Sequence, residues 1–127
     1  MKASYQMSAL PQSGVQVTIE GALMRLLFDF TPADTQNEES ESEETTVYEC
    51  ESVDVHGRTS GDVISAIVND RYSSDKVQAI MANYAEAHDS ESEISAEKRA
   101  EHIEEYEAYQ SWRKHAKDIA RTVVSLI

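Results

Sequence analysis

Residues 59–84, TSGDVISAIVNDRYSSDKVQAIMANY, carry the clearest structural signal in this chain. Thr59 and Asp62 stand at the spacing of a capping box, and Ser73 is a second residue of the type that caps helix N-termini. Apolar residues follow each cap at helical spacing, which predicts a helical hairpin packed into a core. These stripes are Val63, Ile64, Ile67 and Val68, then Val77, Ile80, Met81 and Tyr84.

Two short helices joined by a tight turn also match the outline of a DNA-reading helix-turn-helix. A recognition helix needs Arg, Lys, Asn or Gln on its exposed face. Residues 74–87 offer Lys76, Gln78 and Asn83, but Asp75 and Glu86 oppose them. The whole chain has 24 acidic residues against 11 basic ones and a net charge of -13, whereas DNA binding depends on neutralising phosphates. We therefore interpret the pair as core helices and expect no direct nucleic-acid binding.

Upstream of residue 59 the pattern changes to that of strands. Residues 15–19, VQVTI, alternate apolar and polar side chains, and residues 23–30, LMRLLFDF, follow a turn at Gly21. Residues 46–56, TVYECESVDVH, form a third run that ends at Gly57. The predicted fold class is α+β: a three-stranded antiparallel meander, the helical hairpin and a long C-terminal helix.

Two alternatives remain open in these strands. Residues 22–30 also fit helical spacing, although the preceding turn and the following Thr31-Pro32 favour a strand. In the third strand, Tyr48 and Cys50 have one parity and Val53 and Val55 the other. Either both faces of this strand are covered, or a bulge near Glu51-Ser52 shifts the alternation.

The negative charge is concentrated in two blocks. Residues 34–46 contain many acids and no large apolar side chain, so they cannot bury enough surface to offset the entropy lost on ordering. We predict a flexible acidic loop there. Residues 88–95, HDSESEIS, form a second, shorter acidic linker before the last helix.

The last element is a long helix. With Ser95 as its N-cap, nothing interrupts it up to the end of the chain, because the last glycine is Gly61 and no proline follows. Its second half has an apolar seam, whose aromatic residues suit either the core or an interface with a partner or a second copy. The candidate interaction surface is Tyr106, Tyr109, Trp112, Arg113, Ile119 and Val123.

Length and composition limit the organisation. A chain of 127 residues, 40% hydrophobic and 28% charged, predicts a single domain over residues 1–127. The single cysteine, Cys50, cannot form an intrachain disulfide. The N-terminus lacks the apolar run of a signal peptide, and no stretch is apolar enough for a membrane span. We expect synthesis in the cytoplasm and no membrane partner.

No pattern of catalytic or metal-binding residues emerges from the sequence. The four histidines, His56, His88, His102 and His115, do not pair at the helical spacing of metal ligands. Nucleophile elbows, phosphate-binding glycine loops and Cys-x-x-Cys pairs are missing as well. We therefore predict that the protein is not an enzyme and has no catalytic, cofactor-binding or metal-binding residues and no small-molecule substrate.

One resemblance places the chain in a biological setting. Residues Ala66-Ile67-Val68, Arg71-Tyr72-Ser73, Asp75 and Ala79-Ile80 follow a pattern AIV-x-x-RYS-x-D-x-x-x-AI. A terminal WR-x-x-AK-x-IA pattern matches Trp112-Arg113, Ala116-Lys117 and Ile119-Ala120. Through these two patterns, the C-terminal half of the chain resembles small uncharacterised proteins encoded by prophages of anaerobic gut bacteria. The resemblance implies a structural or accessory role for a protein encoded near the tail genes. It assigns no catalytic residue in this chain.

Two functional hypotheses follow. The first is a non-enzymatic structural or assembly protein of phage origin that acts through protein–protein contacts, with a tail-associated role and incorporation into the virion as its specific form. The second is an acidic decoy that occupies the basic groove of a nucleic-acid-binding protein. Regularly spaced, ordered carboxylates along residues 97–107 would favour the decoy, since mimicry requires charges held on a rigid support.

Overall fold

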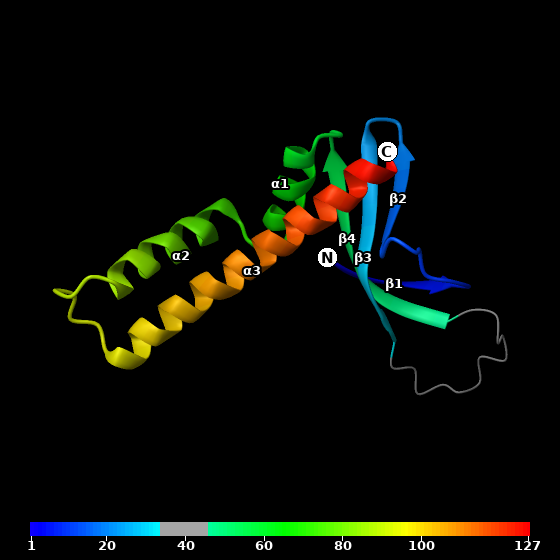
Figure 1. Cartoon of the computed structure of the whole chain (residues 1–127). Helices are drawn as coiled ribbons and strands as arrows, with labels where there is room; N and C mark the ends of the chain where they lie inside the picture. The colour runs from blue at the N-terminus through cyan, green and yellow to red at the C-terminus, as the bar shows by residue number, and fades with distance from the viewer. Residues whose placement is uncertain (34–45) are drawn as a thin grey trace.

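The computed structural model describes residues 1–33 and 46–127, which form a four-stranded sheet and three helices (Figure 1). The predicted α+β class is confirmed, but the three-stranded sheet is wrong by one strand. Of the acidic loop predicted at about 34–46, residues 34–45 lie outside the described residues, and Thr46 begins a strand. The elements are β1 (Lys2–Met7), β2 (Val15–Glu20), β3 (Leu23–Pro32), β4 (Thr46–His56), α1 (Ser60–Arg71), α2 (Ser74–Ala87) and α3 (Ala96–Leu126).

The sheet has the order β1-β4-β3-β2, with all neighbours antiparallel. β2, β3 and β4 form the predicted meander, and residues 23–32 are a strand rather than a helix. Gly21, at φ 61°, makes the tight turn in which Glu20 pairs with Leu23. The additional strand, β1, pairs with the first half of β4, so that Tyr5 lies opposite Tyr48.

Of the two alternatives for β4, the bulge near Glu51-Ser52 is wrong, because the irregularity lies in the neighbouring strand β3. The register between these strands shifts between Phe28 and Thr31, and Asp29 has a positive φ of 56°. β4 itself pairs continuously with β1. The other alternative is therefore confirmed, because Cys50 on one face of β4 and Val53 on the other are both buried.

All three helices begin at the predicted caps. The Thr59 hydroxyl accepts from the Asp62 N–H and the Asp62 carboxylate accepts from the Thr59 N–H, which completes a capping box. Ser73 and Ser95 cap α2 and α3 in the same way, each accepting one backbone N–H. These hydrogen bonds satisfy donors that a helix start leaves free.

The predicted hairpin of α1 with α2 is wrong in its pairing. Tyr72, the C-cap of α1, is extended (φ -125°, ψ 110°), and the chain changes direction there. α1 packs on β4 and on α3, while α2 packs along α3. Figure 1 shows α2 and the first half of α3 leaving the sheet side by side. We call residues 74–108 the helical arm.

One core joins the sheet to the helices. The second half of α3 crosses β2 and α1, and its buried residues meet the helix-facing side of the sheet. In the described part of the chain, no helix has the length and apolar character needed to cross a membrane. The largest fully buried side chains of this core are Met24, Leu26, Phe28, Val55, Val63, Ile67 and Val123.

Candidate functional site

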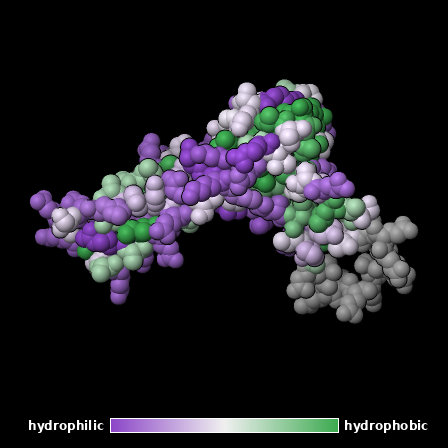
Figure 2. All heavy atoms as spheres, in the orientation of Figure 1, coloured by the Kyte–Doolittle hydropathy of each residue, from purple (hydrophilic) through white to green (hydrophobic). Residues whose placement is uncertain are grey.

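The helical arm displays carboxylates along the exposed side of α3. Glu97, Glu101 and Glu105 follow one another every four residues, which corresponds to about 6 Å of helix axis per step. Glu101, Glu104 and Glu105 line a shallow surface depression together with Ala108. These carboxylates are therefore ordered and regularly spaced. Figure 2 shows that hydrophilic residues cover much of the arm.

The tip of the arm is closed by Arg99. Its guanidinium donates hydrogen bonds to the carbonyls of Ala87 (2.7 Å), Asp89 (3.1 Å) and Ser92 (3.2 Å). Because helix C-termini leave carbonyls without partners, one arginine here satisfies both the end of α2 and the acidic linker. The predicted linker at 88–95 is thus held against α3, and the guanidinium is turned inward from the carboxylate row.

Aromatic contacts brace the two helices of the arm. Tyr84 of α2 stacks on Tyr106 of α3 with ring centroids 3.7 Å apart, and it meets the edge of His88 at 4.6 Å. Nearer the sheet, Tyr72 and Tyr109 form an edge-to-face pair at 5.2 Å. Such pairs contribute about 0.5–1.5 kcal/mol each beyond burial. They give the carboxylates on α3 a firm support.

The residues predicted as an interaction surface lie mostly inside the protein. Tyr109, Trp112, Ile119 and Val123 are buried in the common core, and Tyr106 is half-buried against Tyr84. Arg113 is exposed. The apolar seam of α3 is therefore occupied by the protein's own sheet and helices, and a partner could reach only the exposed polar side of this helix.

Trp112 connects α3 to α1 and to the sheet. Its indole N–H donates to the Ile67 carbonyl at 3.2 Å, and its ring lies 6.3 Å from that of Phe28. The guanidinium of Arg71 lies over the indole, 3.4 Å from the ring centroid. Arg71 also donates to Glu51 at 2.9 Å. This cation thus joins an aromatic face to a buried carboxylate.

Glu51 is a charged residue on the helix-facing side of β4, and only 4% of it is exposed. Its carboxylate meets Arg71, Lys2 (3.1 Å) and the amino group of Met1 (3.3 Å), which also contacts Asp70. Burial alone would raise the pKa of Glu51, but the hydrogen bonds and charges of Lys2 and the amino group outweigh it and lower the pKa. Glu51 therefore ties β1 to the end of α1.

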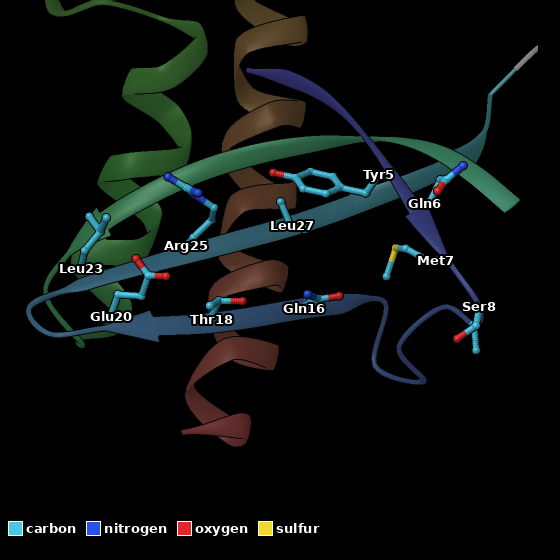
Figure 3. A pocket seen from close by; sticks show the side chains of 11 residues that line it. Tyr5, Gln6, Met7, Ser8, Gln16, Thr18, Glu20, Leu23, Arg25 and Leu27 are labelled. Atoms are coloured by element: carbon cyan, nitrogen blue, oxygen red, sulfur yellow. The ribbon is translucent and has the colours of Figure 1, made fainter. Parts of the chain in front are cut away.

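A groove of about 420 Å³ lies on the other face of the sheet (Figure 3). Leu27 lies on this face and is buried, and Arg25 forms an ion pair with Asp54 at 2.8 Å. Hydrogen bonding to Arg25 lowers the pKa of Asp54. The groove could not be predicted because β1 was not. Its lining is Tyr5, Gln6, Met7, Ser8, Ala9, Gln16, Thr18, Glu20, Leu23, Arg25 and Leu27.

The histidines do not form a metal centre in the described residues. Nε2 of His115 lies 2.7 and 2.9 Å from the two carboxylate oxygens of Asp29, and this pair fastens α3 to the bulge of β3. His102 is buried in α3, away from that pair. Within residues 1–33 and 46–127, no group of three His, Cys, Asp or Glu side chains could hold a metal ion.

Comparison with known proteins identifies no relative of this chain: no family model, no curated protein and no solved structure matches it.

Proposed function

We propose that this protein acts without catalysis, through protein–protein contacts, as a structural or assembly component of phage origin. The observation that carries the proposal is the helical arm, which leaves the sheet (Figure 1) and carries exposed glutamates on α3 within a hydrophilic surface (Figure 2). The resemblance of residues 66–80 and 112–120 to prophage-encoded proteins supports the phage setting. More specifically, the protein has a tail-associated role and is incorporated into the virion.

The arm has the properties of a recognition element rather than of core structure alone. Its apolar side is already used between α2 and α3, where Ile80 and Ala87 are buried. Its outer side carries Glu101, Glu104 and Glu105. A row of like charges on a rigid support steers a basic partner and fixes its register, which increases the association rate and the specificity.

Capture of partners from the native host tests this proposal. The full chain, carrying an affinity tag, is incubated with a lysate in which the prophage has been induced, and bound proteins are identified by mass spectrometry. Enrichment of virion structural or assembly proteins supports the proposal. Capture of metabolic enzymes alone, or turnover of a small molecule by the purified protein, contradicts it.

The spacing of the carboxylates favours one second candidate, an acidic decoy for a nucleic-acid-binding protein. Such mimicry needs negative charges at regular intervals on a fixed support, and α3 supplies them from Glu97 to Glu105. The decoy hypothesis predicts capture of a nuclease, polymerase or other DNA-binding protein, and competition between the chain and DNA for it. Enrichment of virion proteins that DNA does not displace would count against it.

Matched variants test whether the acidic row itself binds. The arm variant combines Glu101→Gln, Glu104→Gln and Glu105→Gln. The control variant removes the same number of charges away from the arm, through Glu20→Gln, Glu49→Gln and Asp118→Asn. We expect the arm variant to lose most of the captured partner and the control variant to retain it. If both variants retain the captured partner equally, the acidic row of the arm does not bind it.

A further inference from the structure

The free edge of β2 is a second surface with specific chemistry. β2 is an outer strand of the sheet, so one side of its backbone has no neighbouring strand among residues 1–33 and 46–127. Glu20 and Leu23 close a two-residue turn, and such a closing pair exchanges both of its backbone hydrogen bonds. Since bonding alternates along an antiparallel strand, the N–H and C=O of Thr18 also point to β3. Those of Val17 and Ile19 point outward.

The start of β2 agrees with this assignment. Val15 has the same parity as Val17, and both of its backbone groups are bonded to the Ser13 side chain. The Ser13 hydroxyl donates to the Val15 carbonyl at 2.9 Å, and the Val15 N–H donates to the Ser13 oxygen at 3.3 Å. The edge is therefore closed at Val15 by its own chain and open at Val17 and Ile19.

Nothing on β2 discourages pairing with another strand. Natural edge strands usually carry lysine, proline or a bulge that prevents such pairing. The strand sequence VQVTIE has none of these, and the bulge of this sheet lies in β3 on the side that faces β4. Ile19 is 51% exposed although its parity places it on the helix-facing side with Val17. An additional strand would cover it.

Apolar surface continues from β2 to the end of α3. α3 contacts β2, and Leu126 and Ile127 are 49% and 47% exposed. Figure 2 shows apolar residues gathered at this corner of the molecule. Residues 119–127 include one charged side chain, Arg121, and β2 has one, Glu20. Two chains of net charge -13 can therefore approach one another here with little repulsion between acids.

We propose that the β2 edge binds the β2 edge of a second copy of this chain in an antiparallel, two-fold arrangement. Pairing about Thr18 places Val17 opposite Ile19 of the other copy, so that the outward N–H and C=O groups of both strands are satisfied reciprocally. Glu20 then lies opposite Gln16 rather than another acid. The two sheets become continuous, and the helical arms remain free to bind, so this dimer does not depend on what the arms recognise.

Light scattering on the purified full chain tests the dimer. At about 100 µM, a dimer with a micromolar dissociation constant is almost fully assembled. We expect twice the monomer mass for the wild-type chain, the monomer mass for Ile19→Lys, and the dimer mass for Met81→Lys. Met81 is a matched control because it is 45% exposed and lies on α2. Circular dichroism verifies that each variant is folded.

Crosslinking provides an independent readout that does not need a destabilising change. In the proposed pairing Thr18 faces its own copy across a non-hydrogen-bonded pair, where Cα atoms are about 4.5 Å apart and a disulfide can form. Cys50 is fully buried and does not compete. We expect mild oxidation to link Thr18→Cys chains far faster than Met81→Cys chains. A monomeric wild-type chain, a folded Ile19→Lys dimer, or equal linking of the two cysteine variants would each overturn the proposal.

Discussion

Replacing Trp112 tests whether the seam of α3 is core. Trp112→Phe removes the indole N–H bond to Ile67, worth about 0.5–1.5 kcal/mol, and weakens the stacking of Arg71, worth about 0.5–1 kcal/mol. The phenyl ring is also smaller than the indole and buries less apolar area. Together these effects should lower the free energy of unfolding by about 2–3 kcal/mol. Trp112→Ala also leaves a cavity beside Phe28, so we expect about 3–5 kcal/mol.

Urea unfolding followed by far-ultraviolet circular dichroism measures these losses, because the variants lack the single tryptophan of the chain. Arg113→Ala is the matched control: Arg113 is adjacent in sequence but exposed, and we expect a change within about 0.5 kcal/mol. If Trp112→Ala costs less than about 1 kcal/mol, or no more than Arg113→Ala, Trp112 is not part of the core.

Three further changes test the contacts around the site. Glu51→Gln should lower the free energy of unfolding at pH 7 by about 1–3 kcal/mol, since it leaves three cations without their carboxylate. The folded-state pKa of Glu51 is lowered, so its stabilisation is present above the ordinary glutamate pKa and is lost as pH falls through the folded value. Unfolding curves should therefore show a shallower acid dependence in Glu51→Gln than in the wild type. Arg99→Ala should open the arm tip, with faster amide hydrogen exchange in residues 85–95 and unchanged exchange in the sheet; uniform exchange throughout would contradict the clamp. Gly57→Ala places a methyl group against the Asp62 carboxylate and should disturb the capping box of α1, at a cost of about 2 kcal/mol in thermal unfolding; a neutral effect would show that the cap tolerates displacement.

Local chemistry explains which elements could be predicted from the sequence. Thr59, Ser73 and Ser95 are caps whose hydrogen bonds form within a few residues, and all three begin helices as expected. β2 and β3 were recognised because apolar alternation and a glycine turn occur together. β1 could not be predicted because KASYQM has one strong strand former, Tyr5, and depends on pairing with residues about 40 to 50 positions away.

Long-range packing accounts for what could not be predicted. The apolar stripe of α2 fits α1 or α3 equally well, and only the extended backbone of Tyr72 directs it to α3. The seam around Trp112 has the same composition whether it meets its own sheet or a partner. The ion pairs of Glu51 could not be predicted, because Lys2 and Arg71 are distant from it in sequence. Which elements of a chain pack against one another is decided by the tertiary structure, not by the local sequence.

Coupling of carboxylates to amines in a complex with a captured partner tests the role of the helical arm most directly. A zero-length reagent joins a glutamate to a lysine only where the two side chains touch, and mass spectrometry then locates the link. The account predicts links from Glu101, Glu104 and Glu105 to lysines of the partner. Links confined to acids of the sheet, such as Glu20 and Glu49, with none from the arm, would contradict it.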